Sequence, residues 1–456
     1  MESLFSEIFP AADKSVWLNQ VLNESKPSRA GTSESIESIY EALRWPTAEG
    51  FTVEPYYTPD DLASLPLHRI QQAQKQTPGW LTAPTYTVTD EKAGNLAIHQ
   101  AIQNGADALV LSLKKRPALS SDMQLLARLL DGIKLSETPI FFKTNDALKL
   151  VETLDHIAPY QIKGGLLYDL PNQSVQEYGQ TIATVTRATA SSPHFYTICA
   201  SSHSFHNAGA TASQELAFTL AYLADLYDYL TDSGLSIEQL IAKTMLSVAV
   251  GTSYFMEIAK LRALRVLFNR LCSFYTPGNP GVFVHAQTST FYNATATPYT
   301  NMLRATAEAM AAVVGGCNAL TIPPYDTVLG QSGSEFSDRI ARNISILLKE
   351  ESHLDKVADP SAGAYYIESL TNQLTESAWL LFLDVEKQGG YEQTMTSGFI
   401  KQKIDQAYQT KVEAIRNGNV IVGVTKFRSD EGISVNIAEE TKADSLPVRR
   451  LASEFE

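Results

Sequence analysis

The chain has 456 residues, of which 44% are hydrophobic and 19% are charged, and its formal net charge is -14. This length suits a barrel of about 250 residues with additions at both ends, and the composition is that of an ordinary globular protein. The acidic balance argues against a nucleic-acid partner, and the absence of an apolar run of membrane-spanning length or a basic leader predicts a cytoplasmic protein without membrane contact.

The first predicted element is a short helix within residues 1–22, which carries large apolar side chains such as Phe9 and Trp17. A Ser-rich segment, 25–38, reads as a linker. Exposed apolar residues on a tethered terminal helix predict docking, either onto the rest of this protein or onto another chain.

From Trp80 onward, near-continuous apolar runs alternate with helical patterns, which is typical of a parallel sheet buried on both faces. The pattern predicts an α/β fold of the (β/α)8 TIM-barrel type. The predicted strands are 81–88, 108–113, 139–144, 164–170, 195–202, 245–251, 282–289 and 319–322. The predicted helices are 91–104, 121–135, 145–156, 175–190, 213–233, 237–243 and 254–274, one that ends at Gly315-Gly316, one that begins near Ser334, and then 370–387 and 391–417. The three cysteines are far apart and without metal-ligand spacing, so they are expected to be reduced and packed.

Several long motifs carry a family resemblance. They are Tyr299 with Asn301, EAMAA at 308–312, FSDRIARN at 336–343, EES at 350–352 and DPSAGAYYIESLT at 359–371, with TAEGFTVEPYYTPDDL at 47–62, AGATASQELAFTLA at 208–221 and YFMEIAKLRALR at 254–265 upstream. In these motifs the chain resembles the methylmalonyl-CoA mutase family, the adenosylcobalamin-dependent acyl-CoA mutases. The resemblance covers most of the chain and is weak between 84 and 193.

The resemblance implies three parts. Residues 1–40 would be an N-terminal extension and linker that makes subunit contacts, since the family forms dimers through such extensions. Residues 41–370 would be an acyl-CoA mutase-type TIM barrel, and 371–456 a C-terminal helical region and tail. A flavodoxin-like cobalamin-binding domain is not expected within this sequence.

The family's active members place a Tyr-His pair before the AGAT segment, where the histidine bonds the thioester carbonyl and the tyrosine contacts the cobalamin face. The matching positions here are His203 and Ser204, so the resemblance implies degenerate positions and no catalytic residue. A nearby run, from Ser201 to Ser204, could suggest a nucleophile beside a base, but adjacent residues rarely point at each other.

Active members also carry an arginine two residues before a serine after the seventh strand. Gln287 stands at the arginine position and Ser289 at the serine position, and a neutral amide lacks the charge-assisted grip of a guanidinium. The family's glutamine after the last strand is expected at Asn318. Ser201, Gln287, Ser289 and Asn318 are therefore expected to line a vestigial substrate pocket. A cationic run, 114–116, follows the second strand and could attract phosphate.

The family's cobalamin motif is Asp-x-His-x-x-Gly, in which the histidine ligates cobalt. None of the eight histidines stands in that motif, so no cofactor-binding or metal-binding residue is expected in this chain. Adenosylcobalamin would be held by a partner subunit.

The resemblance and the degenerate positions together favour the non-catalytic small subunit of a heterodimeric mutase. A homologous large subunit would hold adenosylcobalamin and interconvert (R)-methylmalonyl-CoA and succinyl-CoA. One alternative is the substrate-binding subunit of a split adenosylcobalamin-dependent acyl-CoA mutase. Another is a regulatory protein that senses acyl-CoA without turnover.

Overall fold

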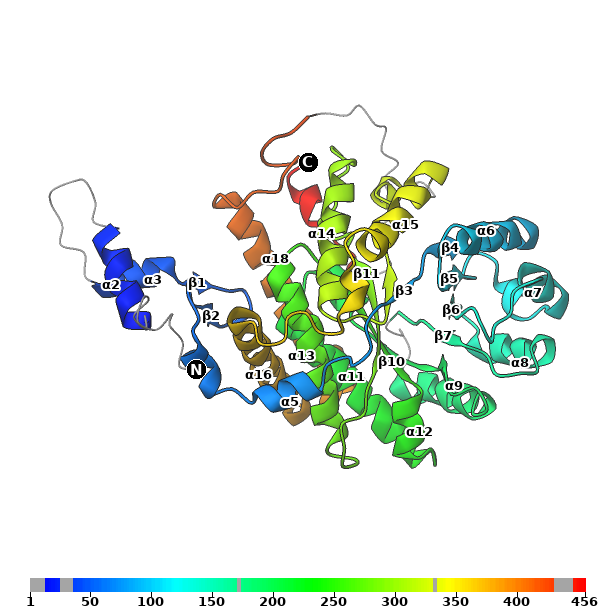
Figure 1. Ribbon diagram of the computed structural model, residues 1–456. Coiled ribbons are helices and arrows are strands. Elements are labelled where there is room, and N and C mark those ends of the chain that lie inside the picture. The colour runs from blue at the N-terminus through cyan, green and yellow to red at the C-terminus, as the bar shows by residue number, and fades with distance from the viewer. Residues whose placement is uncertain (1–12, 25–35, 170–173, 331–333, 430–445) are drawn as a thin grey trace, which may run out of the picture.

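The computed structural model describes residues 13–24, 36–169, 174–330, 334–429 and 446–456. Two parallel five-stranded sheets form its centre (Figure 1). The first sheet runs, in spatial order, β3 (Leu81–Thr82), β12 (Ala319–Thr321), β11 (Phe283–Thr288), β10 (Thr244–Val250) and β9 (Ile198–Ser201). The second runs β4 (Thr85–Thr87), β5 (Leu109–Ser112), β6 (Ile140–Lys143), β7 (Gly164–Leu166) and β8 (Phe195–Tyr196). The expected α/β class with parallel strands is confirmed.

Two of the expected strands are each divided between the sheets. β3 and β4 are separated by Ala83 and Pro84, and β8 and β9 by Thr197 alone. Proline has no amide proton to donate to a strand ladder, which accounts for the first break. The two sheets therefore adjoin along the chain at both places.

Side chains from both sheets meet in one buried group, called here the inter-sheet cluster. Its members are Ala83, Ala108, Val110, Phe141, Leu167, Cys199, Met245 and Ala319, with Leu81, Tyr168, Tyr196 and Phe283 packed against them. Successive residues of a strand face opposite sides, so the intervening residues face the helices instead. Phe141 thus belongs to the inter-sheet cluster, whereas its neighbours Ile140 and Phe142 pack in the core beneath the outer helices.

Helices follow the strands in sequence and cover their outer faces (Figure 1). They are α6 (Glu91–Gln103), α7 (Met123–Leu129), α8 (Ala147–Ile157), α9 (Val175–Ala188), α10 (His203–Ala208), α11 (Ala212–Asp232), α12 (Ile237–Ala242), α13 (Tyr254–Cys272), α14 (Thr300–Val314) and α15 (Glu335–Glu350). Three further helices, α16 (Tyr365–Lys387), α17 (Gly390–Thr396) and α18 (Phe399–Arg416), pack on other helices. The single helix expected over 391–417 is two helices, because Gly398 with φ of 80° begins a new one. The helix expected over 121–135 is also shorter, since α7 begins after the Asp122 cap and ends at Leu129.

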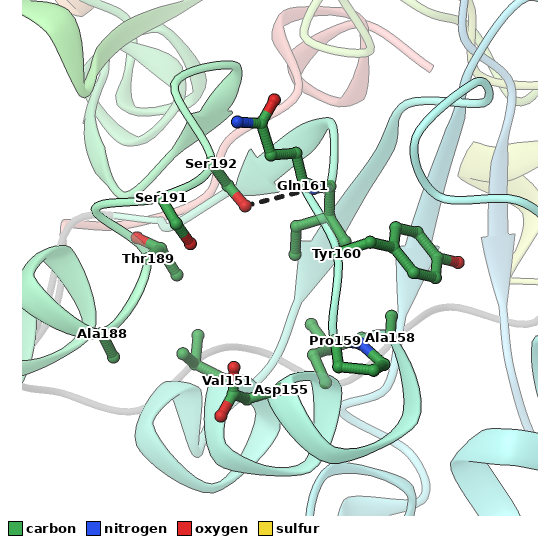
Figure 2. A pocket seen from close by; sticks show the side chains of 12 residues that line it. Val151, Asp155, Ala158, Pro159, Tyr160, Gln161, Ala188, Thr189, Ser191 and Ser192 are labelled. Carbon is green, nitrogen blue, oxygen red and sulfur yellow. Dashed lines mark hydrogen bonds between the residues drawn. The ribbon is translucent and has the colours of Figure 1, made fainter.

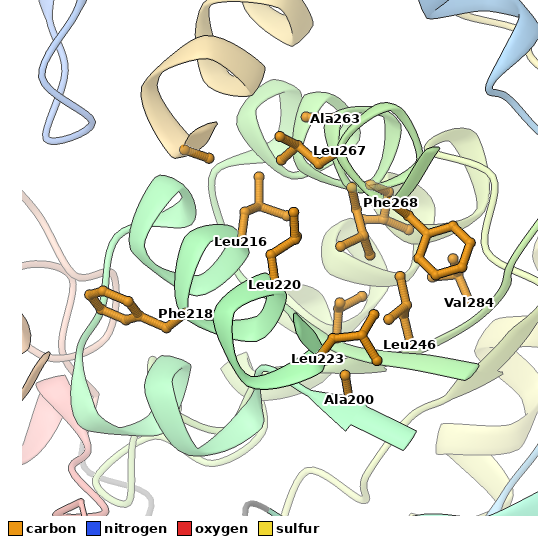
Figure 3. Close-up of a cluster of buried hydrophobic side chains, with 14 of the residues drawn as sticks. Ala200, Leu216, Phe218, Leu220, Leu223, Leu246, Ala263, Leu267, Phe268 and Val284 are labelled. Atoms are coloured by element: carbon orange, nitrogen blue, oxygen red, sulfur yellow. The ribbon is translucent and has the colours of Figure 1, made fainter. Parts of the chain in front are cut away.

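The largest apolar core lies where α11 and α13 cross the strands β9, β10 and β11. Figure 3 shows Leu220 and Leu223 of α11 near Leu246 of β10, and Phe268 of α13 beside Val284 of β11. Both helices are buried along most of their length, and α16 covers them from outside. Cys199, Cys272 and Cys317 are free thiols and buried, as expected.

The N-terminal part lies away from the sheets (Figure 1) and contains α2 (Lys14–Glu24) and α3 (Ile36–Leu43). Trp17 of α2 stacks on Tyr56 with ring centroids 5.2 Å apart. Residues 1–12 and 25–35 of the expected extension and linker lie outside the described residues, and residues 36–38 of the expected linker belong to α3. The elements β1 (Trp45–Pro46), β2 (Thr52–Val53), α4 (Pro59–Ala63) and α5 (Leu67–Gln72) connect this part to β3.

Residues 446–456, called here the C-terminal strap, cross helix α10, which follows β9, and the loop that follows β11. The Arg449 amide donates to the Asn207 carbonyl at 2.8 Å, and the Leu451 amide donates to the Phe291 carbonyl at 2.8 Å. The Glu456 carboxylate accepts from Thr295 Oγ1 at 2.7 Å. No helix in the described part of the chain is long and apolar enough to cross a membrane.

Candidate functional site

The carboxyl ends of the parallel strands meet on one side of the sheets, and polar side chains gather there, at what is called here the mouth. Four of these side chains form a continuous row of hydrogen bonds. His203 Nε2 lies 2.9 Å from Ser247 Oγ, Ser247 Oγ lies 2.8 Å from His285 Nδ1, and His285 Nε2 lies 2.9 Å from Thr321 Oγ1. Thr321 Oγ1 donates to the Ala83 carbonyl at 2.6 Å. The row thus joins α10, β10, β11, β12 and the end of β3.

The direction of the last bond fixes the protons along the row. Thr321 gives its proton to Ala83, so it accepts from His285 Nε2–H; Ser247 then donates to His285 Nδ1. Burial and the nearby Lys143 charge lower the pKa of His203 to about 3, and burial lowers the pKa of His285 well below its usual range. Both imidazoles are therefore neutral near pH 7.

We expect this row to make the protein less stable in mild acid. A histidine whose pKa is depressed by folding stays neutral while the unfolded chain takes up a proton, so stability falls as pH drops below about 6.5. For His203, the loss between pH 8 and pH 5 should be about 2 kcal/mol. Urea unfolding at both pH values checks this: His203→Asn should reduce the difference by that amount, whereas His68→Asn, at an exposed position, should leave it unchanged.

A second group lies beside this row and contains a serine, a histidine and a glutamate. Ser289 Oγ lies 2.7 Å from His206 Nε2, and His206 Nδ1 lies 2.7 Å from Glu215 Oε1. These distances match the order and spacing of a nucleophile, a base and an orienting acid. Ser289 follows β11, His206 is in α10, and Glu215 is in the first turn of α11.

The packing around this group encloses it. Ser289, His206 and Glu215 are 5%, 3% and 2% exposed as whole residues. The rings of Phe291 and Tyr292 pack edge-on against His206 at centroid distances of 5.8 and 6.2 Å.

Glu215 is held mainly by a lysine rather than by the histidine alone. Lys260 Nζ lies 3.1 Å from Glu215 Oε2 and 2.6 Å from Glu257 Oε2. Burial opposes ionisation of the Glu215 carboxyl, but Lys260 and His206 outweigh it and lower the pKa of Glu215 to about 2. Burial likewise disfavours the Lys260 charge, but Glu215 and Glu257 outweigh it and raise the pKa of Lys260.

The structure brings some of the expected site residues together and separates another. Ser201 ends β9, and its Oγ accepts from the His203 amide at 3.4 Å. Ser204 is the second residue of α10. Gln287 in β11 pairs in register with Ala249 and Thr321, two residues beyond His285 on the same face. These residues and Ser289 share the mouth.

Asn318 does not share it, and its expected place after the last strand is wrong. It precedes β12, where its Oδ1 accepts from Arg265 Nη2 at 2.8 Å and from the Val284 amide at 2.9 Å. The carbonyl of Asn318 also accepts from the Leu81 amide at 2.8 Å. Asn318 therefore ties the amino ends of β3, β11 and β12 together, while the mouth end of β12 is Thr321.

The sequence interpretation missed several residues of the mouth. Ser247, His285 and Thr321 lie inside predicted strands, where period-two alternation could have placed them on the same face as Cys199 and Met245. Glu215 and Lys260 lie in two of the motifs that carry the family resemblance, and their positions in the sequence do not indicate that they pair. Among the described residues, no three His, Cys, Asp or Glu side chains lie close enough together to hold a metal ion.

A pocket of about 300 Å³ lies at the other end of the sheets (Figure 2). Its lining residues are Val151, Leu154, Asp155, Ala158, Pro159, Tyr160, Gln161, Ile162, Ala188, Thr189, Ser191 and Ser192. The segments 158–162 and 188–192 precede β7 and β8, which places the pocket at the amino ends of the strands. None of the expected site residues lines it, and Ser192 Oγ is already engaged by the Ile162 amide at 3.1 Å.

A family model and several relatives of known name agree on one family for this chain. The family model for methylmalonyl-CoA mutase matches residues 119–453. The methylmalonyl-CoA mutase small subunit of Porphyromonas gingivalis is 30% identical over 100% of this chain and 77% of that protein. The small subunit of Streptomyces virginiae is 30% identical over 92% of this chain and 71% of that protein. The methylmalonyl-CoA mutase of Cereibacter sphaeroides is 30% identical over 90% of this chain, which spans 64% of that protein.

Proposed function

The chain belongs to the methylmalonyl-CoA mutase family, and on that basis we propose that it is the non-catalytic small subunit of a heterodimeric mutase. A homologous large subunit binds adenosylcobalamin and interconverts (R)-methylmalonyl-CoA and succinyl-CoA. The proposal places this activity in the partner's barrel. The present chain contributes a stable companion surface, since a pair of similar barrels can descend from a twofold dimer in which one copy lost its site.

The observation that carries the proposal is which side chains occupy the mouth. Gln287 stands where a guanidinium would hold an anionic group, and the tyrosine of the active pattern is replaced by His203, whose Nε2 bonds Ser247. Below them, Phe141, Met245 and Phe283 occupy the inter-sheet cluster. A site for a ligand as large as an acyl-CoA needs an open cavity of several hundred Å³, and the large side chains of this cluster occupy part of the space between the two sheets.

The three histidines at the mouth do not fit the role of cobalt ligand. Cobalt in this family takes a histidine nitrogen as its lower ligand. Both ring nitrogens of His206 and His285 are already bonded, and His203 Nε2 is bonded to Ser247. On this proposal, the large subunit holds the cofactor.

The proposal extends to the architecture. We take the two sheets as halves of one (β/α)8 barrel over residues 41–370, because they adjoin at β3/β4 and at β8/β9 and share the inter-sheet cluster. Residues 1–40 form the subunit-contact extension, and 371–456 a helical region and tail. Val16 in this extension is exposed, and so are Leu43, Trp45 and Tyr56 in the segment that follows it, so apolar side chains suited to such a contact continue into the start of the barrel part.

Reconstitution tests the proposal. The chain alone, mixed with adenosylcobalamin and methylmalonyl-CoA, should form no succinyl-CoA and no cob(II)alamin signal. With a large subunit it should form a 1:1 complex that does both, and removal of residues 1–40 should weaken that complex. Turnover by the chain with only a separate cobalamin domain would support the split enzyme instead. Micromolar binding of a CoA ester by the chain alone, seen by calorimetry, would support the sensor.

A further inference from the structure

Lys143 is a lysine at the mouth that the proposed function does not use. It is the last residue of β6, where its side chain falls on the same face as Phe141 of the inter-sheet cluster. The side chain is partly buried. Carboxyl ends of such strands are where parallel α/β proteins place reacting groups, so an inward lysine there has a position suited to chemistry.

Lys143 differs from the other buried lysines in its partners. Lys243 Nζ donates to the carbonyls of Thr189, Ser192 and Phe195 at 2.6, 2.6 and 3.1 Å. Lys260 is paired with two carboxylates, as described above. For Lys143, no hydrogen bond or ion pair exists within the part of the chain that the structure describes.

Five titratable groups interact electrostatically with Lys143. They are Lys114, Asp169, Cys199, His203 and His285. Asp169 is the one carboxylate among them, and its Oδ2 is held by Lys114 Nζ at 2.5 Å. Burial lowers the pKa of Lys143; the Asp169 charge opposes this lowering, and the Lys114 charge adds to it. A lysine amine that is desolvated and lies next to another cation is the type that becomes nucleophilic near neutral pH.

We propose that Lys143 is an amine site for small uncharged aldehydes or ketones, which it binds by forming an imine. The ligand is small because Phe141 and the rest of the inter-sheet cluster fill the space beneath the amine. It is uncharged because Lys114 and Asp169 balance each other.

The bond changes balance without an oxidant. The Nζ lone pair forms a bond to the carbonyl carbon, and the carbonyl oxygen takes up a proton from the nitrogen. The carbon–oxygen bond then breaks, and water leaves with the second amine proton, so that C=N remains. Asp169 is the carboxylate near the amine that can relay these protons.

Reductive trapping tests the proposal on the intact chain. Acetaldehyde or acetone is added with cyanoborohydride at pH 7, and modified lysines are located by peptide mass mapping. Lys143 should be alkylated about tenfold faster than Lys115, an exposed lysine of the neighbouring loop. Equal or slower alkylation of Lys143 in the folded protein overturns the proposal. Urea-denatured protein is the control, and there the two lysines should react alike.

Two variants add a readout that a merely structural lysine would not change. Lys143→Arg keeps the charge and should abolish the fast phase while the urea midpoint stays the same. Lys114→Met frees Asp169 to pair with Lys143, so the pH at which trapping becomes fast should rise and the rate at pH 7 should fall about tenfold. An unchanged pH profile in Lys114→Met also overturns the proposal. Because Lys114 exposes 38% of its side chain, this variant should fold.

Discussion

Replacing Lys260 by methionine is expected to lower the free energy of unfolding by about 3–5 kcal/mol. The Lys260 side chain is 1% exposed, and its ammonium lies between Glu215 and Glu257, whose side chains are 3% and 8% exposed. Methionine fills much the same volume but leaves both carboxylates buried beside each other without a cation. Urea unfolding monitored by circular dichroism measures the change.

Lys134 provides the matched control for this substitution. It also pairs with a glutamate three residues along, at 3.3 Å, but the two side chains are 73% and 68% exposed. An exposed pair contributes little, so Lys134→Met should change stability by less than about 0.5 kcal/mol. If Lys260→Met costs no more than this control, the account of the buried charges is wrong. Adding Glu257→Gln to Lys260→Met should recover part of the loss.

Replacing Arg262 by methionine is expected to lower the free energy of unfolding by a similar amount, about 3–5 kcal/mol, through a different set of buried ion pairs. Arg262 of α13 is 1% exposed; its Nη2 bonds Glu368 of α16 at 2.8 Å, and its Nη1 bonds Asp359. Glu368 is 0% exposed and also accepts from Gln71 Nε2 at 3.1 Å and the Gly363 amide at 2.9 Å. Without the guanidinium, this carboxylate keeps only uncharged donors.

Arg270 in the same helix offers the comparison. Arg270 Nη1 lies 2.9 Å from Glu376 Oε1 of α16, but the two side chains are 24% and 53% exposed. Arg270→Met should therefore cost well under half as much as Arg262→Met in thermal or urea unfolding. Equal losses would mean that packing of α13, rather than the buried ion pairs, governs the effect.

The order of strands and helices was predictable because apolar runs and helical periods alternate so regularly after Trp80. The breaks at Pro84, Thr197 and Gly398 were harder to foresee, since they depend on where a ladder or helix ends in three dimensions. The motif containing Asp359 and Glu368 was visible in the sequence as a family likeness. Its physical role, to neutralise Arg262 from about a hundred residues away, could be recognised only in the fold.

At the mouth, too, some residues could be predicted from the sequence and others required the structure. His203 and Ser289 could be located by their distance from neighbouring motifs, and the structure places both at the strand ends. Asn318 was misplaced because the last strand is short, so an error of a few residues moved it to the opposite end. The pairings of His206 with Glu215 and of Ser247 with His285 join residues from different elements, which no spacing rule reveals.

The C-terminal strap has a consequence for the order in which the protein folds as it is synthesised. The second sheet uses strands that follow one another within residues 85–196, so it can assemble early. Helix α10 and the loop after β11 obtain their hydrogen bonds to Arg449 and Leu451 only after more than a hundred further residues have left the ribosome. Until then these two segments are expected to lack the cover that the strap gives them.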